Sequence, residues 1–149
     1  MEKTSPNYLL KYHELYFQRI EQLKSRVREL KARLEPEEFK RHEAVKLAVR
    51  IRNAEIAIAQ DPNRPEYLLS DELRKFRRYK RGLGRYRIIF CFSNHPPIII
   101  FLYLNTEDSL RKEGSRRDPY EQFKYLLRRG RVSHDPADPK IQKWLAGGK

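Results

Sequence analysis

The sequence contains a single cysteine, Cys91, among its 149 residues. An intramolecular disulfide is therefore impossible, which favours a reducing compartment, and we expect a cytoplasmic protein. Cys91 lies inside an apolar segment, IIFCF. In that position a small buried hydrophobic side chain is the favoured interpretation, ahead of a nucleophile.

Long apolar stretches are also missing. The longest, PPIIIFLYL, has the length of a strand and is too short for a membrane-spanning helix. The N-terminal segment MEKTSPNYLL has no basic region followed by a small-residue cleavage site, so we expect no signal peptide. Together these absences predict a protein without a membrane partner.

The motifs of several enzyme classes are absent as well. A P-loop, a dinucleotide fingerprint and a nucleophile elbow are all missing. The histidines lack the spacing of metal ligands, so we expect neither a metal site nor another cofactor. They are His13, His42, His95 and His134.

Positive charge is what the chain has in excess. Its 33 lysines and arginines face 20 acidic residues, which gives a net charge of +13. Two segments account for this excess: residues 73–90 carry eight basic and no acidic groups, and residues 111–131 carry eight basic and three acidic groups. This concentration of positive charge indicates a polyanionic partner: RNA, DNA, the ribosome or an acidic protein.

The N-terminal part has the periodicity of helices. Residues 8–34 carry apolar side chains at spacings of three and four, which predicts a long amphipathic helix. Pro36 suits the start of a second helix that ends before the prolines of QDPNRP. We expect the two helices to pair as an antiparallel hairpin over residues 8–60. Their surface charges are mixed in sign, which is typical of a solvated face.

Beyond residue 65 the pattern alternates. It predicts strands over 76–81, 85–93 and 98–104, and thus a small antiparallel sheet within 66–104. Gly82 and Gly84 shape the first turn. One face of the second strand is aromatic and can pack on the helices, whereas the other carries Arg85 and Arg87. We therefore expect a one-sided platform that exposes cations in front of the sheet.

A further helix follows the sheet. Asp118 is a good N-cap, Pro119 a good first residue, and Gly130 a good C-terminal stop. The tail predicts a short helix bearing Ile141, Trp144 and Leu145. The sequence thus predicts one α+β domain over residues 1–149. In it a helical hairpin (8–60) packs on an antiparallel sheet (66–104), which is followed by a basic loop and helix (105–130) and a tail (131–149).

Cationic and aromatic residues cluster in the C-terminal half of the chain. The cations can neutralise RNA phosphates or stabilise a phosphate in its transition state, and tyrosine can stack on an unpaired base. A lysine or tyrosine among arginines loses its proton more easily, so it can act as an acid or base. Composition alone favours RNA binding without cleavage over catalysis. The cluster comprises Arg78, Lys80, Arg85, Arg87, Arg111 and Tyr120.

Three spaced motifs within residues 76–130 carry a family resemblance. They are GRYRIIF, IIIFLYLNTEDSLRKEG and DPYEQFKYLLRRG. Their order and spacing resemble the YhaV group of the RelE-like toxins of bacterial toxin–antitoxin systems. This resemblance implies a RelE-like fold and an mRNA endonuclease that acts at the ribosome and inhibits translation. The implied reaction is a metal-independent attack of a ribose 2′-hydroxyl on the adjacent phosphate.

The resemblance also assigns roles to residues. Arg87 matches the arginine that contacts the scissile phosphate, Lys80 matches a base or charge stabiliser, and Tyr120 matches a tyrosine that stacks on a base. Arg111 lies near the position of a leaving-group arginine. Further RNA contacts are expected from Arg78, Arg81, Arg85, Lys112, Arg116 and Arg117. Asn105 and Glu107 belong to the motif, and capping of the turn after the strand is an equally favoured interpretation.

The resemblance implies an antitoxin as partner. We expect an acidic, AbrB-like protein of the PrlF type that covers the cationic surface, and DNA contact only through that antitoxin. Two alternatives stay open. One is a non-catalytic basic protein that binds RNA or the ribosome, and the other is a degenerate toxin retained for its antitoxin contacts.

Overall fold

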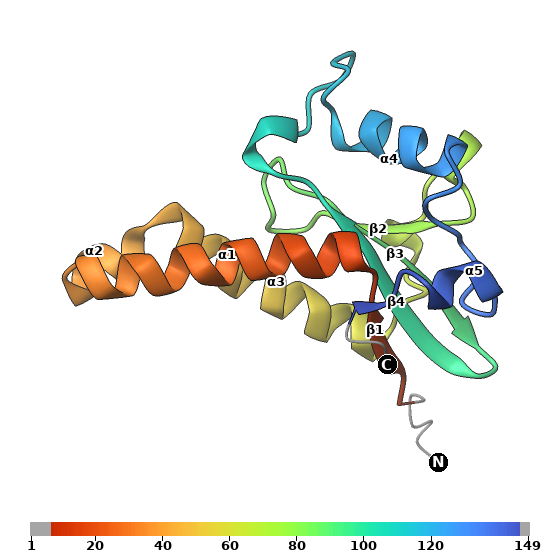
Figure 1. The fold of residues 1–149 in the computed structure, drawn as a ribbon, viewed down its shortest axis with the longest axis horizontal. Coiled ribbons are helices and arrows are strands. Elements are labelled where there is room, and N and C mark those ends of the chain that lie inside the picture. Colours follow the sequence, from red (N-terminus) through yellow and green to blue (C-terminus); the bar gives the residue numbers. More distant parts are fainter. Residues whose placement is uncertain (1–6, 147–149) are drawn as a thin grey trace.

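The computed structural model describes residues 7–146, and Figure 1 shows how its elements are arranged. The ends of the predicted domain, including most of the segment examined for a signal peptide, lie outside the described residues. The elements in chain order are β1 (Leu9–Tyr12), α1 (Glu14–Arg33), α2 (Pro36–Arg41), α3 (Glu43–Gln60), the 3₁₀ turns η1 (Pro65–Tyr67) and η2 (Asp71–Leu73), β2 (Arg77–Tyr79), β3 (Ile88–Asn94), β4 (Pro97–Leu104), η3 (Glu107–Ser109), α4 (Pro119–Arg128) and α5 (Pro139–Gln142).

The four strands form one mixed sheet in the order β1-β4-β3-β2. β2 and β4 both run antiparallel to β3, whereas β1 runs parallel to β4 and places Leu9 opposite Ile98. The α+β class is confirmed, but the prediction of an all-antiparallel sheet is wrong because the sequence pattern did not reveal β1.

The error at β1 concerns the residues before the first helix. Residues 8–12 were expected to open the first helix, but Tyr8, Leu10 and Tyr12 pack on the core with the period of a strand. The helix begins only after His13, whose Nδ1 accepts a hydrogen bond from the Leu15 N–H at 3.1 Å. This side-chain cap marks the change from strand to helix.

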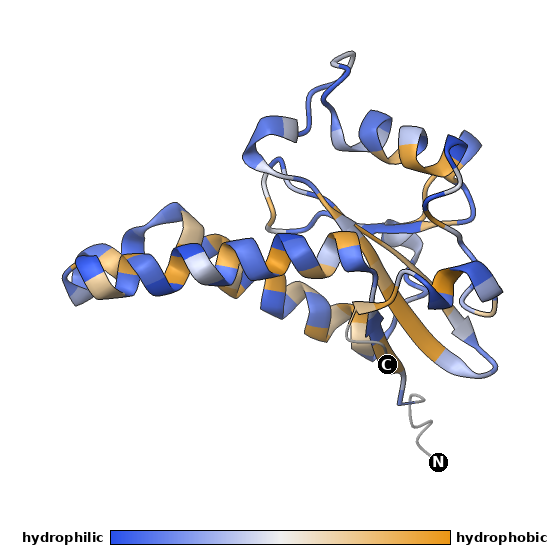
Figure 2. Cartoon of the chain, viewed as in Figure 1, coloured by the Kyte–Doolittle hydropathy of each residue, from blue (hydrophilic) through white to orange (hydrophobic). Residues whose placement is uncertain are grey.

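The first face of the sheet packs on α1 and α3, which lie side by side and extend beyond the sheet, with α2 at their far end (Figure 1). Ile88, Phe90 and Phe101 from the sheet meet Tyr16 of α1 and Ile58 of α3, and all five are fully buried. The N-terminal helices therefore form one layer over this face. Figure 2 shows the apolar character concentrated along β3 and β4.

The second face of the sheet is covered as well, so the prediction of a one-sided platform is wrong. Ile89 and Ile100 of the sheet pack on Phe123 of α4 and Ile141 of α5, and Leu145 completes this second core. Both faces of β3 and β4 are apolar, and such strands require cover on both sides. The C-terminal segment supplies that cover and leaves the cations at the end of the sheet.

The strand boundaries explain where those cations lie. β3 begins at Ile88, three residues later than the predicted start, so Arg85 and Arg87 belong to the segment before the strand. β2 ends at Tyr79, which leaves Lys80 in the turn. None of the helices within residues 7–146 combines the length and apolar character needed to cross a bilayer.

Candidate functional site

A cleft of about 610 Å³ opens between the turn after β2 and the segment that leads into α4. All four residues predicted as catalytic line it, together with Arg78 and a further cation, Lys124. Four carboxylates complete the polar lining. The charged and aromatic lining residues are Arg78, Lys80, Arg87, Arg111, Lys124, Tyr120, Asp71, Glu113, Asp118 and Glu121.

The turn between β2 and β3 brings Lys80 and Arg87 to the same cleft. Gly82 and Gly84 have φ angles of +74° and +59°, a conformation that favours glycine. Between them Leu83 is only 2% exposed and packs in the first core. The turn is thereby anchored at its centre, while its two ends present cations to solvent.

Asn105 holds the second end of this turn. Its side chain is fully buried at the end of β4. Oδ1 accepts a hydrogen bond from the Arg87 N–H at 2.7 Å, and Nδ2 donates to the carbonyl oxygens of Arg85 at 3.2 Å and Ser109 at 2.7 Å. Arg111 adds a backbone hydrogen bond of 2.8 Å to the same Arg85 carbonyl. The segment carrying Arg87 is therefore fastened to the loop after β4.

The guanidinium group of Arg87 is held by neutral oxygens. Nη1 donates to the carbonyls of Gly84 and Tyr86, both at 2.7 Å, and Nε donates to the Tyr120 hydroxyl at 3.1 Å. Within residues 7–146 no carboxylate pairs with Arg87. Its positive charge therefore stays uncompensated, while its position is restrained from three sides.

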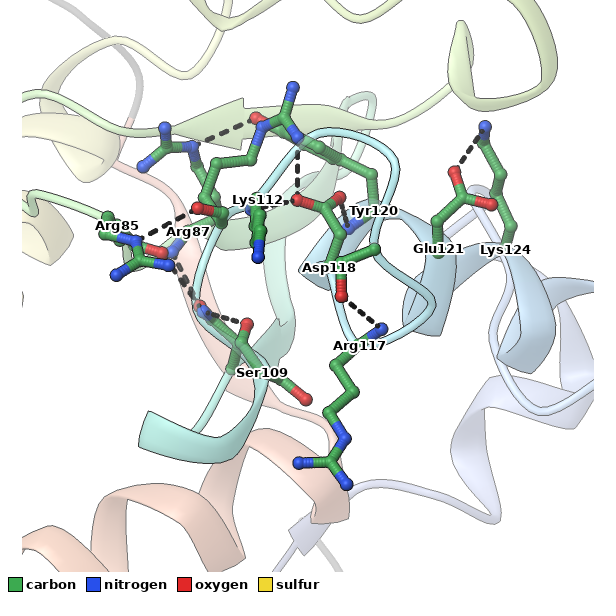
Figure 3. A network of polar contacts seen from close by, with 12 residues as sticks. Arg85, Arg87, Ser109, Lys112, Arg117, Asp118, Tyr120, Glu121 and Lys124 are labelled. Carbon is green, nitrogen blue, oxygen red and sulfur yellow. Dashed lines mark hydrogen bonds and ion pairs between the residues drawn. The ribbon is translucent and has the colours of Figure 1, made fainter.

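Asp118 organises the opposite wall of the cleft, as Figure 3 shows. Its carboxylate is 2% exposed and accepts hydrogen bonds from Arg111 Nη1 and the Lys112 N–H, each at 2.7 Å. The same group caps α4 by accepting from the Tyr120 N–H at 3.0 Å. The hydrogen bond with Asp118 raises the pKa of Arg111.

Tyr120 connects the two walls. Its hydroxyl accepts the hydrogen bond from Arg87, and the Arg111 guanidinium lies 5.0 Å from its ring centroid. This distance is typical of a cation–π contact. Because Arg111 occupies one face of the ring, a stacked base would have only the other face available.

The other predicted site residues have different positions. Arg78 lines the cleft but donates to the carbonyl oxygens of Glu66 and Leu68. Arg85 points away from the cleft and lines a separate groove on the other side of the turn. Arg81, Lys112, Arg116 and Arg117 are exposed and do not line the cleft.

One residue that contacts the supports of the site was not predicted from the sequence. Arg19 of α1 is 7% exposed, and its Nε donates to the Asn105 carbonyl at 3.2 Å. Its Nη2 forms an ion pair of 3.2 Å with Glu107. The helical charges were interpreted as a solvated face, yet position 19 falls on the buried stripe defined by Tyr16 and Leu23. That spacing is the signal that could have found it.

Two further features bear on chemistry. Cys91 is 1% exposed and burial raises the pKa of its thiol, so the interpretation as a buried hydrophobic residue is confirmed. The described part of the chain contains no group of three or more histidine, cysteine, aspartate or glutamate side chains suited to a metal ion.

Comparison with known proteins agrees with this arrangement. The model of a family described as a toxin with endonuclease activity, of a toxin–antitoxin system, matches residues 10–140. The chain belongs to the YhaV toxin family. It is 34% identical over 132 residues to the ribonuclease toxin YhaV of Escherichia coli K12, covering 85% of this chain and 83% of that protein. Toxins YhaV of Escherichia coli O157:H7 and O6:H1 match to the same extent.

No solved structure matches the chain. The YhaV-type resemblance drawn from three short motifs is confirmed by the family match, which also extends over the N-terminal helices. Membership confirms the predicted class, a nuclease toxin of a toxin–antitoxin system, and implies an antitoxin and an RNA substrate as partners. In this YhaV-family toxin the three motifs contain most of the residues that line the cleft.

Proposed function

We propose that this toxin is an endoribonuclease that cleaves mRNA in the cytoplasm without a metal ion and thereby inhibits translation. The observation that carries the proposal is Arg87: its charge is uncompensated by any described carboxylate, yet three neutral oxygens hold it in a cleft that also contains Lys80 and Tyr120. A fixed cation of this kind stabilises the charge that develops on a phosphate during transfer. A relative is named a ribonuclease toxin, which supports RNA as substrate.

The proposed step is an intramolecular displacement on phosphorus. Lys80 acts as the base that takes the proton of the ribose 2′-hydroxyl, and a bond forms between that oxygen and the adjacent phosphorus. The bond from phosphorus to the 5′-oxygen breaks, this oxygen takes a proton from water, and Lys80 returns its proton to the resulting hydroxide. Arg87 faces the phosphoryl oxygens, where negative charge increases. The products are a 2′,3′-cyclic phosphate and a 5′-hydroxyl end.

Arg111 has a modified role in this proposal. Because it pairs with Asp118 and lies over the Tyr120 ring, it contributes positive charge beside the leaving group and orients Tyr120. The free face of Tyr120 then stacks on a base next to the scissile phosphate. Stacking of a base on an aromatic side chain contributes about 1–3 kcal/mol, which is enough to position the nucleotide.

The finer features of the family resemblance belong to the same proposal. We expect a RelE-like arrangement of the helical hairpin on the sheet, cleavage of mRNA on the ribosome, and inhibition by an AbrB-like, PrlF-type antitoxin that covers the cleft. Charge complementarity supports an acidic inhibitor, since five cations line the cleft and one of them, the restrained Arg87, has no carboxylate partner among the described residues.

The test compares purified wild-type toxin with Arg87→Ala, Lys80→Ala and the control Arg41→Ala at the exposed end of α2. Wild type and control should cut RNA in the presence of a chelator and leave cyclic phosphate ends. Arg87→Ala should lose cleavage by about 100-fold or more, the usual effect of removing a group that stabilises the transition state.

A different result would favour the alternative of a non-catalytic RNA-binding protein. In that case wild-type toxin binds RNA without cutting it. Arg87→Ala then only lowers the affinity for RNA and reduces the slope of log affinity against log salt by about one. Cleavage that disappears on chelation would contradict the proposed metal-independent step. Mapping of mRNA 5′ ends after expression, with and without the antitoxin, extends the test to cells.

A further inference from the structure

A second groove, of about 690 Å³, adjoins the cleft on the opposite side of the β2–β3 turn. Its walls are α1, the first turns of α3, the turn itself and the loop through η3. Gly84, Arg85 and Tyr86 line this groove, whereas Arg87 lines the cleft. The two hollows therefore share one thin wall, the turn that presents Arg87.

The groove holds cations that are free to meet a ligand. Arg50 of α3 and Arg85 are both exposed, and neither pairs with a carboxylate of the described residues. Arg85 uses its Nε for the Arg111 carbonyl at 3.1 Å, which fixes the side chain and leaves its charge uncompensated. Arg19 and Arg26 add further positive charge, although each pairs with a glutamate.

A polymeric substrate needs such a surface. An RNA chain cut in its interior continues on both sides of the scissile phosphate, so it must leave the cleft over a neighbouring surface. A third hollow, beside Ser109, also adjoins the Asn105 loop, but its polar lining consists of amides and hydroxyl groups and of one cation, Arg19, which is paired with Glu107. Of these two surfaces, the one with uncompensated arginines matches a phosphate backbone.

We propose that the groove between Arg50 and Arg85 binds single-stranded RNA that flanks the cleaved bond. Arg50 and Arg85 contact backbone phosphates, and Tyr86 contributes an aromatic ring to the same lining. This inference rests on the proposed ribonuclease function and adds to it a binding site outside the cleft. The groove raises affinity for longer substrates and leaves the chemical step to the cleft.

Steady-state cleavage of matched RNAs tests the inference. One RNA spans only the cleavage site, and two others carry an extension on the 5′ or the 3′ side. For wild type, one of the extensions should lower KM several-fold. Arg50→Ala should abolish that gain, leave kcat unchanged, and reduce the slope of log KM against log salt by about 0.7, the value for one phosphate contact on a single strand.

Arg28→Ala is the matched control, since Arg28 is an exposed arginine of α1 that lines none of the hollows described here. It should keep the wild-type gain and slope. Photo-crosslinking of a thiouridine in the extension provides a readout independent of turnover, and the crosslinks should fall on peptides containing Arg50 or Tyr86.

The inference is overturned if Arg50→Ala and Arg28→Ala behave alike while both still cut RNA, or if crosslinks avoid the groove. It is also overturned if Arg50→Ala weakens binding of the antitoxin and leaves RNA unaffected, because the groove would then serve a protein partner. Failure of the proposed function has a different signature, which is that wild-type toxin cuts none of the three RNAs.

Discussion

The Oδ1 atom of Asn105 accepts a 2.7 Å hydrogen bond from the backbone N–H of Arg87, a residue 18 positions away in the chain. In the sheet Ile88 of β3 pairs with Leu104 of β4, so these two residues come immediately beyond the last strand pair. There the backbones separate, and the Asn105 amide replaces the missing backbone partner. The cation proposed to face the scissile phosphate is thus positioned by a side-chain extension of the sheet.

Asn105→Ala should therefore impair both stability and cleavage. It leaves the Arg87 N–H and the Arg85 and Ser109 carbonyls without their partner, which costs about 1–3 kcal/mol in the free energy of unfolding. It also releases the turn that carries Arg87, so kcat should fall under conditions in which the variant is still folded. Urea unfolding and cleavage kinetics measure the two effects.

Ser109→Ala is the control for Asn105, because only the backbone carbonyl of Ser109 takes part in this network. Its stability and kcat should match those of wild type. An Asn105→Ala variant that unfolds like wild type or keeps full kcat would contradict the positioning role of the amide.

Two substitutions at Tyr120 should distinguish the contribution of its hydroxyl group to cleavage from that of its ring. Tyr120→Phe removes the 3.1 Å hydrogen bond with Arg87 but keeps the ring under Arg111, so kcat should fall by about tenfold or less. Tyr120→Ala also removes the stacking surface, so KM should rise by an amount equivalent to about 1–3 kcal/mol. Steady-state kinetics on one RNA substrate give both quantities.

The same helix offers a matched comparison for Tyr120. Tyr125 of α4 is exposed, and Arg129 contacts its ring at 5.2 Å and donates to its hydroxyl at 2.9 Å. This tyrosine–arginine pair lies outside the cleft. Tyr125→Ala should leave both kcat and KM unchanged. Equal effects of the substitutions at the two tyrosines would contradict the proposed role of Tyr120 in binding RNA.

Asp118→Ala should destabilise the wall formed by the start of α4. The substitution removes an N-cap, which alone costs about 0.5–2 kcal/mol, and also removes the acceptor for Arg111 and the Lys112 N–H. Asp118→Asn retains a cap acceptor and should recover most of the stability. Asp138→Ala, at the N-cap of α5, is the control: it should lower stability without a change in KM.

Acidification should weaken the fold through His13. Burial lowers the pKa of this histidine below its usual 6.5, although Glu14 and the Arg131 carbonyl act in the opposite direction. Because the folded pKa is lower, the unfolded chain binds more protons, and stability is lost as the pH falls below about 6.5 towards the folded pKa. Urea titrations on either side of this pH measure the loss.

His13→Asn isolates that contribution, since asparagine can still cap α1 and does not titrate. The difference in unfolding free energy between wild type and His13→Asn should become less favourable to wild type as the pH falls. A difference that stays constant with pH would show that His13 does not bind its proton more weakly in the folded state.

The N-terminal helices show where sequence patterns were reliable and where they were not. The spacing of Tyr16, Leu23 and Leu30 predicted the buried stripe of α1, because helical periodicity is a local property. The same spacing carried the prediction into residues 9–12, which instead pair with β4. Four residues are too few to distinguish the two periods, and only the distant partner strand decides between them.

The sequence by itself determined the family, the helix caps at Asp118 and Gly130, and Tyr120 with four of the five cations that line the cleft, since composition, motifs and caps depend on neighbours along the chain. Tertiary structure alone decided which arginines act together. It turned Arg85 to a separate groove, paired Arg111 with Asp118, and brought Arg19 from α1 to Asn105. The contact of Arg111 with Asp118 spans seven positions, but that of Arg19 with Asn105 spans 86, and it forms because the burial of the sheet brings α1 against the end of β4.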